Sequence, residues 1–158
     1  LIIDERSEEL SSSQTSTDDL VNHVPKIITS GVVLWTHVTS PFIDERAYEN
    51  IVNQYFCNLK TNDSLMSVTK VQKFFWNHKG PLNYNKLYEK WPRTQTLEPI
   101  FEVNSGAFVA NIKIYKEFSD RIGNNPLLYT IDEREAFDVD WEFDFEIAEL
   151  MWRKHGRL

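Results

Sequence analysis

A short apolar run with a helix pattern directly behind it constrains this fold more than any other feature. Residues 31–38 begin with glycine and continue through β-branched and aromatic residues, which is typical of a buried, parallel strand. Residues 39–41 end the run. The stretch 44–59 then places an apolar side chain at every fourth position, as on one face of a helix: Ala47, Ile51, Tyr55 and Leu59. A strand, a loop and a helix in this order form one βα unit.

The rest of the chain continues this alternation. Apolar periodicity predicts further strands at 65–71, 106–110, 127–131 and 136–139, and helices at 17–28, 112–118 and 142–154. Thr17, with two acids behind it, suits the start of the first helix, and Pro25 either kinks that helix or marks its end. The predicted fold class is therefore α/β, with a mixed, mostly parallel sheet and flanking helices.

Composition narrows the class of protein further. A length of 158 residues with 41% hydrophobic content predicts a single domain, 1–158, with a real core, and a net charge of −7 argues against wrapping nucleic acid. No apolar run approaches the roughly 18–20 residues of a membrane helix, and residues 1–9 do not resemble a signal peptide. The single cysteine, Cys57, suits a reducing compartment. We expect a cytoplasmic protein without nucleic-acid or membrane partners.

Residues 74–103 are expected to form an extended arm. The stretch 77–80 lies between two aromatic segments and predicts a hairpin turn, and three prolines (Pro81, Pro92 and Pro99) interrupt the chain beyond that turn. The aromatic trio 74–76 could stack a base, but a core or interface fits it better, because aromatic residues are enriched at protein contacts. Interleaved lysines suit an anionic small ligand or a partner subunit: Lys70, Lys73, Lys79, Lys86 and Lys90.

The most informative candidate site lies near the end of the chain. Asp138 lies near the end of the predicted strand 136–139, and Asp140 comes just after that strand. Asp144 lies in the first turn of the predicted last helix. On a strand, Asp138 and Asp140 would point the same way, and two carboxylates suit Mg²⁺, which also takes waters and phosphate oxygens. Alternatively, these acids cap the helix that comes next, because its dipole favours them.

Two other segments carry groups that could bind a ligand. Arg93 lies beside a proline in the arm and could grip a carboxylate or phosphate with two hydrogen bonds, or could be an ordinary surface arginine. His37, Thr39 and Ser40 lie at the end of the first predicted strand, where they would face a crevice. Alternatively, the hydroxyls bond the backbone of the turn and His37 is a satisfied buried histidine.

Several common chemistries find no support in the sequence. The four histidines show no zinc-binding spacing, the five glycines do not form a phosphate loop, and no residue arrangement suggests a hydrolytic triad. Cys57, in the middle of a predicted helix, suits a packing role better than a nucleophile.

Taken in order, short motifs along nearly the whole chain resemble those of one enzyme family. The segments are 6–10 with the serines after it (R-P-x-E-L in the family), 39–41 (T-S-P), 81–83 (P-L-N), 92–95 (P-R-x-Q), 104–108 (N-G-x-x-Y) and 137–149 (I-D-I-D…D-x-x-x-A-E). The chain thus resembles the acylneuraminate cytidylyltransferases, which make CMP-activated nonulosonic acids. The resemblance implies a Rossmann-like, nucleotide-diphospho-sugar transferase type of fold with a dimerisation arm.

The resemblance also implies a reaction and residue roles. In this family the anomeric hydroxyl of a sialic-acid-like sugar attacks the α-phosphate of CTP, and pyrophosphate is released. Asp138 and Asp140 match the catalytic aspartates that hold the Mg²⁺, and Arg93 matches an arginine that binds the sugar carboxylate from the dimer arm. The residues expected to bind substrate on this basis are Arg93, Gln95, Asn104, Ser105, His37, Ser40 and Thr17.

The chain departs from the family pattern in three places. The family's opening strand and its glycine-, arginine- and lysine-bearing phosphate loop have no counterpart, so we expect the domain to be incomplete at its N-terminus and the isolated chain to be inactive. His37 stands where the family usually has glutamine, and either Asn104 or Ser105 is the equivalent of the family asparagine. A family lysine that approaches the sugar matches Lys70, Lys73 or Lys79.

The expected function is transfer of CMP from CTP to a nonulosonic sugar acid by a Mg²⁺-dependent, homodimeric cytidylyltransferase. One alternative is a truncated, inactive relative that serves as a sugar-binding or interaction module. Another is a cytidylyltransferase for a different 3-deoxy sugar acid.

Overall fold

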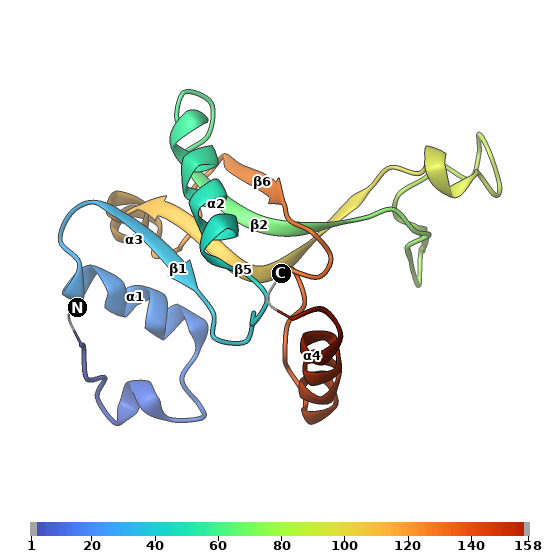
Figure 1. Cartoon of the computed structure of the whole chain (residues 1–158). Coiled ribbons are helices and arrows are strands. Elements are labelled where there is room, and N and C mark those ends of the chain that lie inside the picture. Colours follow the sequence, from blue (N-terminus) through green and yellow to red (C-terminus); the bar gives the residue numbers. More distant parts are fainter. Residues whose placement is uncertain (1–2, 157–158) are drawn as a thin grey trace.

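A four-stranded mixed sheet forms the centre of the computed structural model, which describes residues 3–156. The strands are β1 (Val32–Thr36), β2 (Ser64–Val71), β5 (Ile100–Asn111) and β6 (Pro126–Thr130), in the spatial order β1-β5-β2-β6. The helices are α1 (Thr17–Ile27), α2 (Glu45–Cys57), α3 (Ile112–Phe118) and α4 (Glu142–His155), with a short 3₁₀ helix η1 (Glu9–Ser11) before them. Figure 1 shows these elements in place.

The α/β class with flanking helices is confirmed, but the expectation of a mostly parallel sheet is wrong. β5 pairs antiparallel with both β1 and β2, and only β2 and β6 pair in parallel. The helix α2 links β1 to β2, so these two strands run in the same direction, as a βα unit predicts. They are not neighbours, because β5 lies between them in the opposite direction. The βα pattern predicts that β1 and β2 run in the same direction. A local pattern does not reveal that another strand lies between them.

Two expected strands differ from the structure. Residues 136–139 form a loop, since the Val139 amide donates to the Thr39 carbonyl at 2.9 Å and the Ala136 amide to the Asp132 carbonyl at 2.8 Å. β1 is an edge strand with one buried residue, Val33, rather than a fully buried parallel strand. An apolar run this short does not reveal whether one or both of its edges are paired.

The helices follow their local signals closely. α1 begins after Ser16, whose hydroxyl accepts from the Asp19 amide while the Asp19 carboxylate accepts from the Ser16 amide, and the helix continues through Pro25 to Ile27. The Asp44 carboxylate caps α2 by accepting from the Ala47 amide at 2.8 Å. Such caps satisfy amides that have no partner inside the helix.

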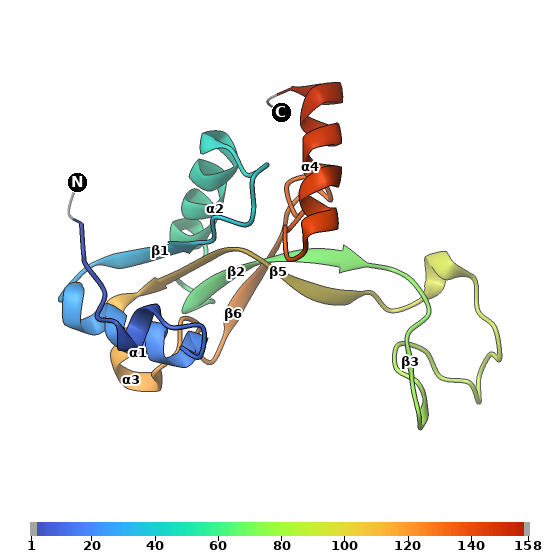
Figure 2. The same cartoon turned by 90° about the horizontal axis from the view of Figure 1, so that it is seen from below.

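Helices cover both faces of the sheet, as Figure 2 shows, with α1 and α3 on one side and α2 on the other. The α2 side is packed by Ile43, Ala47, Ile51, Tyr55, Leu65, Ala107, Val109 and Ile131. The opposite side is packed by Val21, Val33, Ala110, Ile112 and Tyr115. Burial of these side chains supplies the main driving force for folding.

Residues 72–99, here called the arm, extend away from the sheet between β2 and β5 (Figures 1 and 2). The predicted hairpin is confirmed: β3 (Trp76–Asn77) pairs antiparallel with β4 (Gly80–Pro81), and a 3₁₀ helix, η2 (Thr94–Thr96), comes after it. Asn83 is only 3% exposed and closes the base of the arm. Its amide donates to the carbonyls of Lys73 and Glu98, each at 2.8 Å, and its oxygen accepts from the Phe75 amide.

None of the helices in residues 3–156 combines the length and the hydrophobicity required to cross a bilayer.

Candidate functional site

A polar cavity of about 430 Å³ gathers carboxylates from three separate segments of the chain. Its lining consists of Thr69, Glu102, Val103, Asn104, Glu133, Ala136, Phe137, Asp138, Asp140 and Asp144. Five of these side chains are acidic, and none is lysine, arginine or histidine. An anionic ligand would therefore need a cation to accompany it into this cavity.

The position of the cavity follows from the directions of the strands. Thr69 lies late in β2, the loop 136–140 follows β6, and that loop is bonded through Val139 to Thr39, which follows β1. β1, β2 and β6 run in one direction, so all three approach the cavity with their carboxyl ends. Ligands of α/β sheets bind at this end of the strands.

The loop that carries Asp138 and Asp140 is held at several points. Besides the bond from Val139 to Thr39, the Phe137 ring packs edge-on against Phe42, with 6.0 Å between the ring centres. Asp138 is half-buried and accepts from the Val139 amide at 3.1 Å through one carboxylate oxygen. Asp140 is exposed, and its carboxylate has no hydrogen-bond partner within the described residues. The fixed loop thus leaves carboxylate oxygens free to bind a cation.

Asp144 takes the helix-capping role that the sequence left open for this cluster. One of its oxygens accepts from the amides of Trp141, at 2.9 Å, and Asp140, at 3.2 Å. Asp138 and Asp140 do not cap α4 in this way. The cluster therefore divides into one acid that holds the backbone and two that face the cavity without capping the helix.

A bulge in β5 brings Asn104 into the cavity wall. Residues 104–107 of β5 lie opposite the single residue Ser67 of β2, between the paired positions Val68–Val103 and Met66–Phe108. The buried Ser67 hydroxyl donates to the Asn104 oxygen at 2.6 Å and accepts from the Ala107 amide at 2.8 Å. The Asn104 amide group also donates to Thr69 at 3.2 Å. Bulges of this kind re-aim side chains near functional sites.

The same bulge distinguishes Asn104 from Ser105. Ser105 adopts a left-handed backbone conformation, with φ of 57°, and is not part of the cavity wall. Gly106 is packed so closely that a β-carbon there would clash with the Ile43 side chain. Asn104 and Gly106 are thus fixed by packing, while Ser105 is the residue that the bulge accommodates between them.

None of the other predicted site residues belongs to the cavity wall. Ser40 is buried, and its hydroxyl has no hydrogen-bond partner in the part of the chain that the structure describes. His37 lies just after β1 and packs with aromatic rings at the edge of the sheet. Thr17 is exposed at the start of α1, and Arg93 and Gln95 are exposed on the arm, so the single chain does not bring these three to the cavity.

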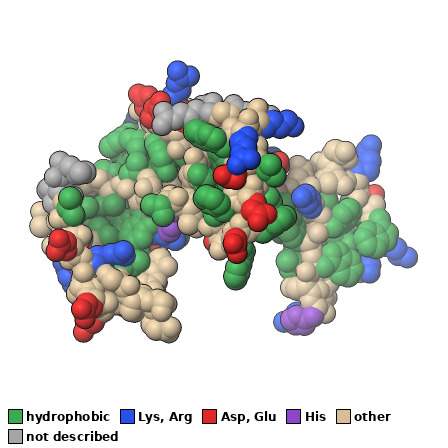
Figure 3. Space-filling view, turned by 60° about the horizontal axis from the view of Figure 1, so that its bottom comes forward, with side chains coloured by type: hydrophobic (Ala, Val, Ile, Leu, Met, Phe, Trp, Pro, Cys, Tyr) green, Lys and Arg blue, Asp and Glu red, His purple; other side chains and the backbone are tan. Residues whose placement is uncertain are grey.

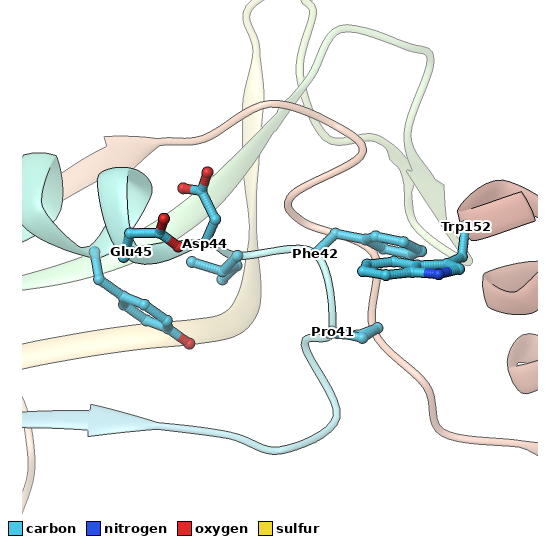
Figure 4. A pocket seen from close by; sticks show the side chains of 7 residues that line it. Pro41, Phe42, Asp44, Glu45 and Trp152 are labelled. Carbon is cyan, nitrogen blue, oxygen red and sulfur yellow. The ribbon is translucent and has the colours of Figure 1, made fainter. Parts of the chain in front are cut away.

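A second, mostly apolar pocket of about 390 Å³ lies between α4 and the segment 41–48. Figure 4 shows Trp152 of α4 turned toward Phe42 and Pro41. Asp44 and Glu45 also line this pocket. The last helix and the loop that follows β1 thus face the same pocket.

Sequence reasoning missed Glu102, Glu133 and Arg121. Glu102 and Glu133 belong to the cavity wall but lie 31 residues apart, and no local pattern links them. Arg121 follows α3 and contacts His37, 84 positions away in the sequence. Only the fold reveals such pairs.

No group of three or more His, Cys, Asp or Glu side chains within the described residues is arranged to hold a metal ion by itself. Mg²⁺ does not need such a group, since it commonly takes one or two carboxylates and completes its shell with waters and phosphate oxygens. Two free carboxylates in a polar cavity are consistent with that requirement.

No protein-family model matches the chain, and no curated protein matches it significantly.

Proposed function

We propose that this chain belongs to a Mg²⁺-dependent cytidylyltransferase that transfers CMP from CTP to a nonulosonic, sialic-acid-like sugar. The observation that carries the proposal is the convergence of Asp138, Asp140 and Asn104 on one cavity. Asn104 belongs to one motif and the two aspartates to another, and the two motifs lie 34 or more positions apart at these residues. If the motif matches were accidental, there would be no reason for these residues to line the same cavity.

The strand directions support a Rossmann-like, nucleotide-diphospho-sugar transferase type of fold. β1, β2 and β6 share one direction and deliver the cavity residues at their carboxyl ends, which is where α/β folds bind nucleotides. The antiparallel β5 contributes Asn104 through its bulge. This mixture of strand directions is compatible with the proposed type.

The residues of the cavity suit Mg²⁺ by their chemistry. Asp138 and Asp140 offer hard carboxylate oxygens that are not consumed by helix capping, and Glu102 and Glu133 add negative charge to the same wall. Bound Mg²⁺ would neutralise charge on the triphosphate of CTP. Asp138 and Asp140 would hold it, and the bonds from Val139 to Thr39 and from Asp144 to Trp141 would keep their loop in place.

In the proposed reaction, the anomeric hydroxyl oxygen of the sugar forms a bond to the α-phosphorus of CTP. The bond from that phosphorus to the oxygen shared with the β-phosphate breaks, pyrophosphate leaves, and the hydroxyl proton passes to solvent or a base. Asn104, whose oxygen accepts from Ser67 and whose NH₂ group donates one hydrogen bond to Thr69, would offer the second hydrogen of that group to the ligand. Such positioning and charge neutralisation supply most of the catalysis in phosphoryl transfer.

A homodimer would complete the site through the arm. The arm contains five lysine or arginine residues and two glutamates, whereas the cavity wall contains five acids. Figure 3 shows the basic and hydrophobic side chains of the arm beside one another. Leu87 and Tyr88 are 94% and 91% exposed, and such apolar surface favours burial against a protein partner. We expect the arm of one copy to bring Arg93 to the sugar carboxylate in the other.

Release of pyrophosphate tests the proposal directly. The full-length protein, CTP, Mg²⁺ and a panel of nonulosonic and other 3-deoxy sugar acids should yield pyrophosphate and a CMP-sugar with at least one panel member. Asp138→Asn should lower turnover by about 100-fold or more, because the loss of a metal ligand removes charge stabilisation worth several kcal/mol. Glu49→Gln, an exposed carboxylate on α2, is the matched control and should leave turnover unchanged. Unchanged turnover by Asp138→Asn would contradict the metal assignment.

A further inference from the structure

His37 accepts hydrogen bonds at one nitrogen from two different donors. The Trp35 indole nitrogen lies 2.9 Å from His37 Nε2, and a terminal nitrogen of Arg121 lies 3.1 Å from the same atom. The Arg121 guanidinium also lies over the Phe108 ring at 3.6 Å and near the Trp35 ring at 5.4 Å. Two aromatic rings and the imidazole thus fix the position of this cation.

The chemistry of the two donors determines the state of the imidazole. An indole N–H and a guanidinium can only donate hydrogen bonds, so Nε2 must carry a lone pair and no proton. A neutral imidazole then carries its proton on Nδ1. Burial first, and the nearby Arg121 second, lower the pKa of His37 from its ordinary value, while Asp138 acts in the opposite direction. The neutral ring is therefore favoured near neutral pH.

His37 is not part of the cavity wall, but the chain connects it to the candidate site. Thr39, two positions along the chain, accepts the hydrogen bond from Val139, which lies between Asp138 and Asp140. The Nδ1–H of His37 has no acceptor among residues 3–156. This nitrogen is not among the buried polar atoms that lack a partner, so it is reachable by water or by a ligand.

Arg121 has no other partner that would explain its place. It is half-buried, burial lowers its pKa, and no carboxylate forms an ion pair with it within the residues that the structure describes. The charges of Tyr115 and Asp120 oppose this lowering of the pKa, although Asp120 does not lie within ion-pair distance of the guanidinium. Its side chain is positioned by His37 and by the rings of Trp35 and Phe108.

We propose that Trp35 and Arg121 hold His37 as the neutral tautomer protonated on Nδ1, which makes it a fixed hydrogen-bond donor to an oxygen of the bound sugar acid. Arg121 is then a positioning residue, since it acts on the ligand through His37. The identity of the ligand rests on the proposed function, whereas the tautomer does not.

The tautomer can be measured without any substrate. Long-range ¹H–¹⁵N correlation spectra of the full-length protein, labelled at histidine, separate protonated from unprotonated ring nitrogens, and the His37→Asn variant identifies the His37 signals. At pH 7 we expect a protonated Nδ1 and an unprotonated Nε2. A proton on Nε2, whether alone or together with one on Nδ1, would overturn the proposal.

Variants show whether the two donors cause this state. Trp35→Phe combined with Arg121→Met removes both donors while keeping apolar bulk, and should redistribute the proton between the two nitrogens. Arg134→Met, an exposed arginine paired with Asp132, is the control and should leave the tautomer unchanged. If the double variant loses its fold by circular dichroism, each single variant still removes one donor and should shift the Nε2 signal. An unchanged signal in both would overturn the role of Arg121.

Kinetics then test the ligand contact. Arg121→Met should raise KM for the sugar acid about 5- to 20-fold, with KM for CTP unchanged, because one hydrogen bond is misdirected. Equal KM values for the sugar acid would overturn the assigned contact. Absence of transfer by the unmodified protein would instead contradict the proposed function, and the tautomer measurement would still decide the state of His37.

Discussion

The acidic cavity and the arm differ both in charge and in how their backbones are held. Carboxylates concentrate in the cavity, and its loop is held by bonds to neighbouring loops, such as that from Val139 to Thr39. The charged residues of the arm are mostly lysine and arginine, five against two glutamates, and the buried side chain of Asn83 joins its two ends. The cavity has no cation of its own, and the arm has few acids, so each region lacks the charge that the other supplies.

This difference gives a physical reason for a site shared between two copies. Four aromatic rings, Phe74, Trp76, Tyr84 and Trp91, pack against one another on the arm, and Lys86 lies 5.0 Å from the Trp76 ring centre. The arm is thus a pre-organised surface even in one copy. Pre-organisation reduces the entropy that binding must overcome.

Among the variants that test the difference between the cavity and the arm, the largest effect is expected when Arg93 is replaced. Arg93→Met removes a guanidinium that the proposal pairs with the sugar carboxylate, and the loss of a charge-assisted contact is worth about 1.5–3 kcal/mol. KM for the sugar acid should rise roughly 10- to 100-fold, with little change for CTP. Steady-state kinetics measure this, and Arg46→Met on the exposed face of α2 is the matched control. Equal effects on both substrates would argue against a sugar contact.

A smaller effect is expected at the base of the arm. Asn83→Ala leaves two carbonyls and one amide without their partner, which costs about 1–3 kcal/mol. The arm should become sensitive to limited proteolysis between residues 72 and 99, while the sheet stays protected. Asn85→Ala, at an exposed turn of the same arm, is the control. Protection of the arm in Asn83→Ala would show that the aromatic cluster alone holds it.

The smallest effect concerns the body of the fold and not the arm. Asp44→Ala removes the cap of α2 and should lower the free energy of unfolding by about 1 kcal/mol. Urea denaturation measures this change, and Glu49→Gln again serves as the control. Arm proteolysis should not change. A loss of arm protection would mean that the two regions are coupled through the fold.

The helices could be predicted from local signals, whereas the sheet could not. Thr17 with the two acids behind it and the periodic face Ala47–Ile51–Tyr55 each act within a few residues, and the structure has helices where they predict them. The insertion of β5 between β1 and β2 depends on pairs that lie from 29 (Val71 with Ile100) to 79 (Val32 with Asn111) positions apart, which no local pattern records. Residues 136–139 resemble a strand in composition but bond to Thr39 and Asp132 instead of a neighbouring strand.

The candidate site, like the fold, could be predicted only where short stretches of sequence carry the signal. Asp138, Asp140 and Asn104 belong to short motifs, and these three residues line one cavity. Glu102 and Glu133 reach the cavity only because β5 and the segment after β6 pass beside it, and Arg121 reaches His37 only through the packing of α3 on the sheet. Motifs identify residues by their neighbours in sequence, whereas Glu102, Glu133 and Arg121 are defined by their neighbours in space.

Mixing two impaired variants tests the shared site most directly. Asp138→Asn damages the cavity and Arg93→Met damages the arm, so a dimer that contains one copy of each has one site with both parts intact. Pyrophosphate release, measured at a sugar-acid concentration where each variant alone is nearly silent, should recover in part when the two are mixed and allowed to exchange subunits. If the unmodified protein is active but the mixture stays silent after subunit exchange is verified, cavity and arm do not come from different copies.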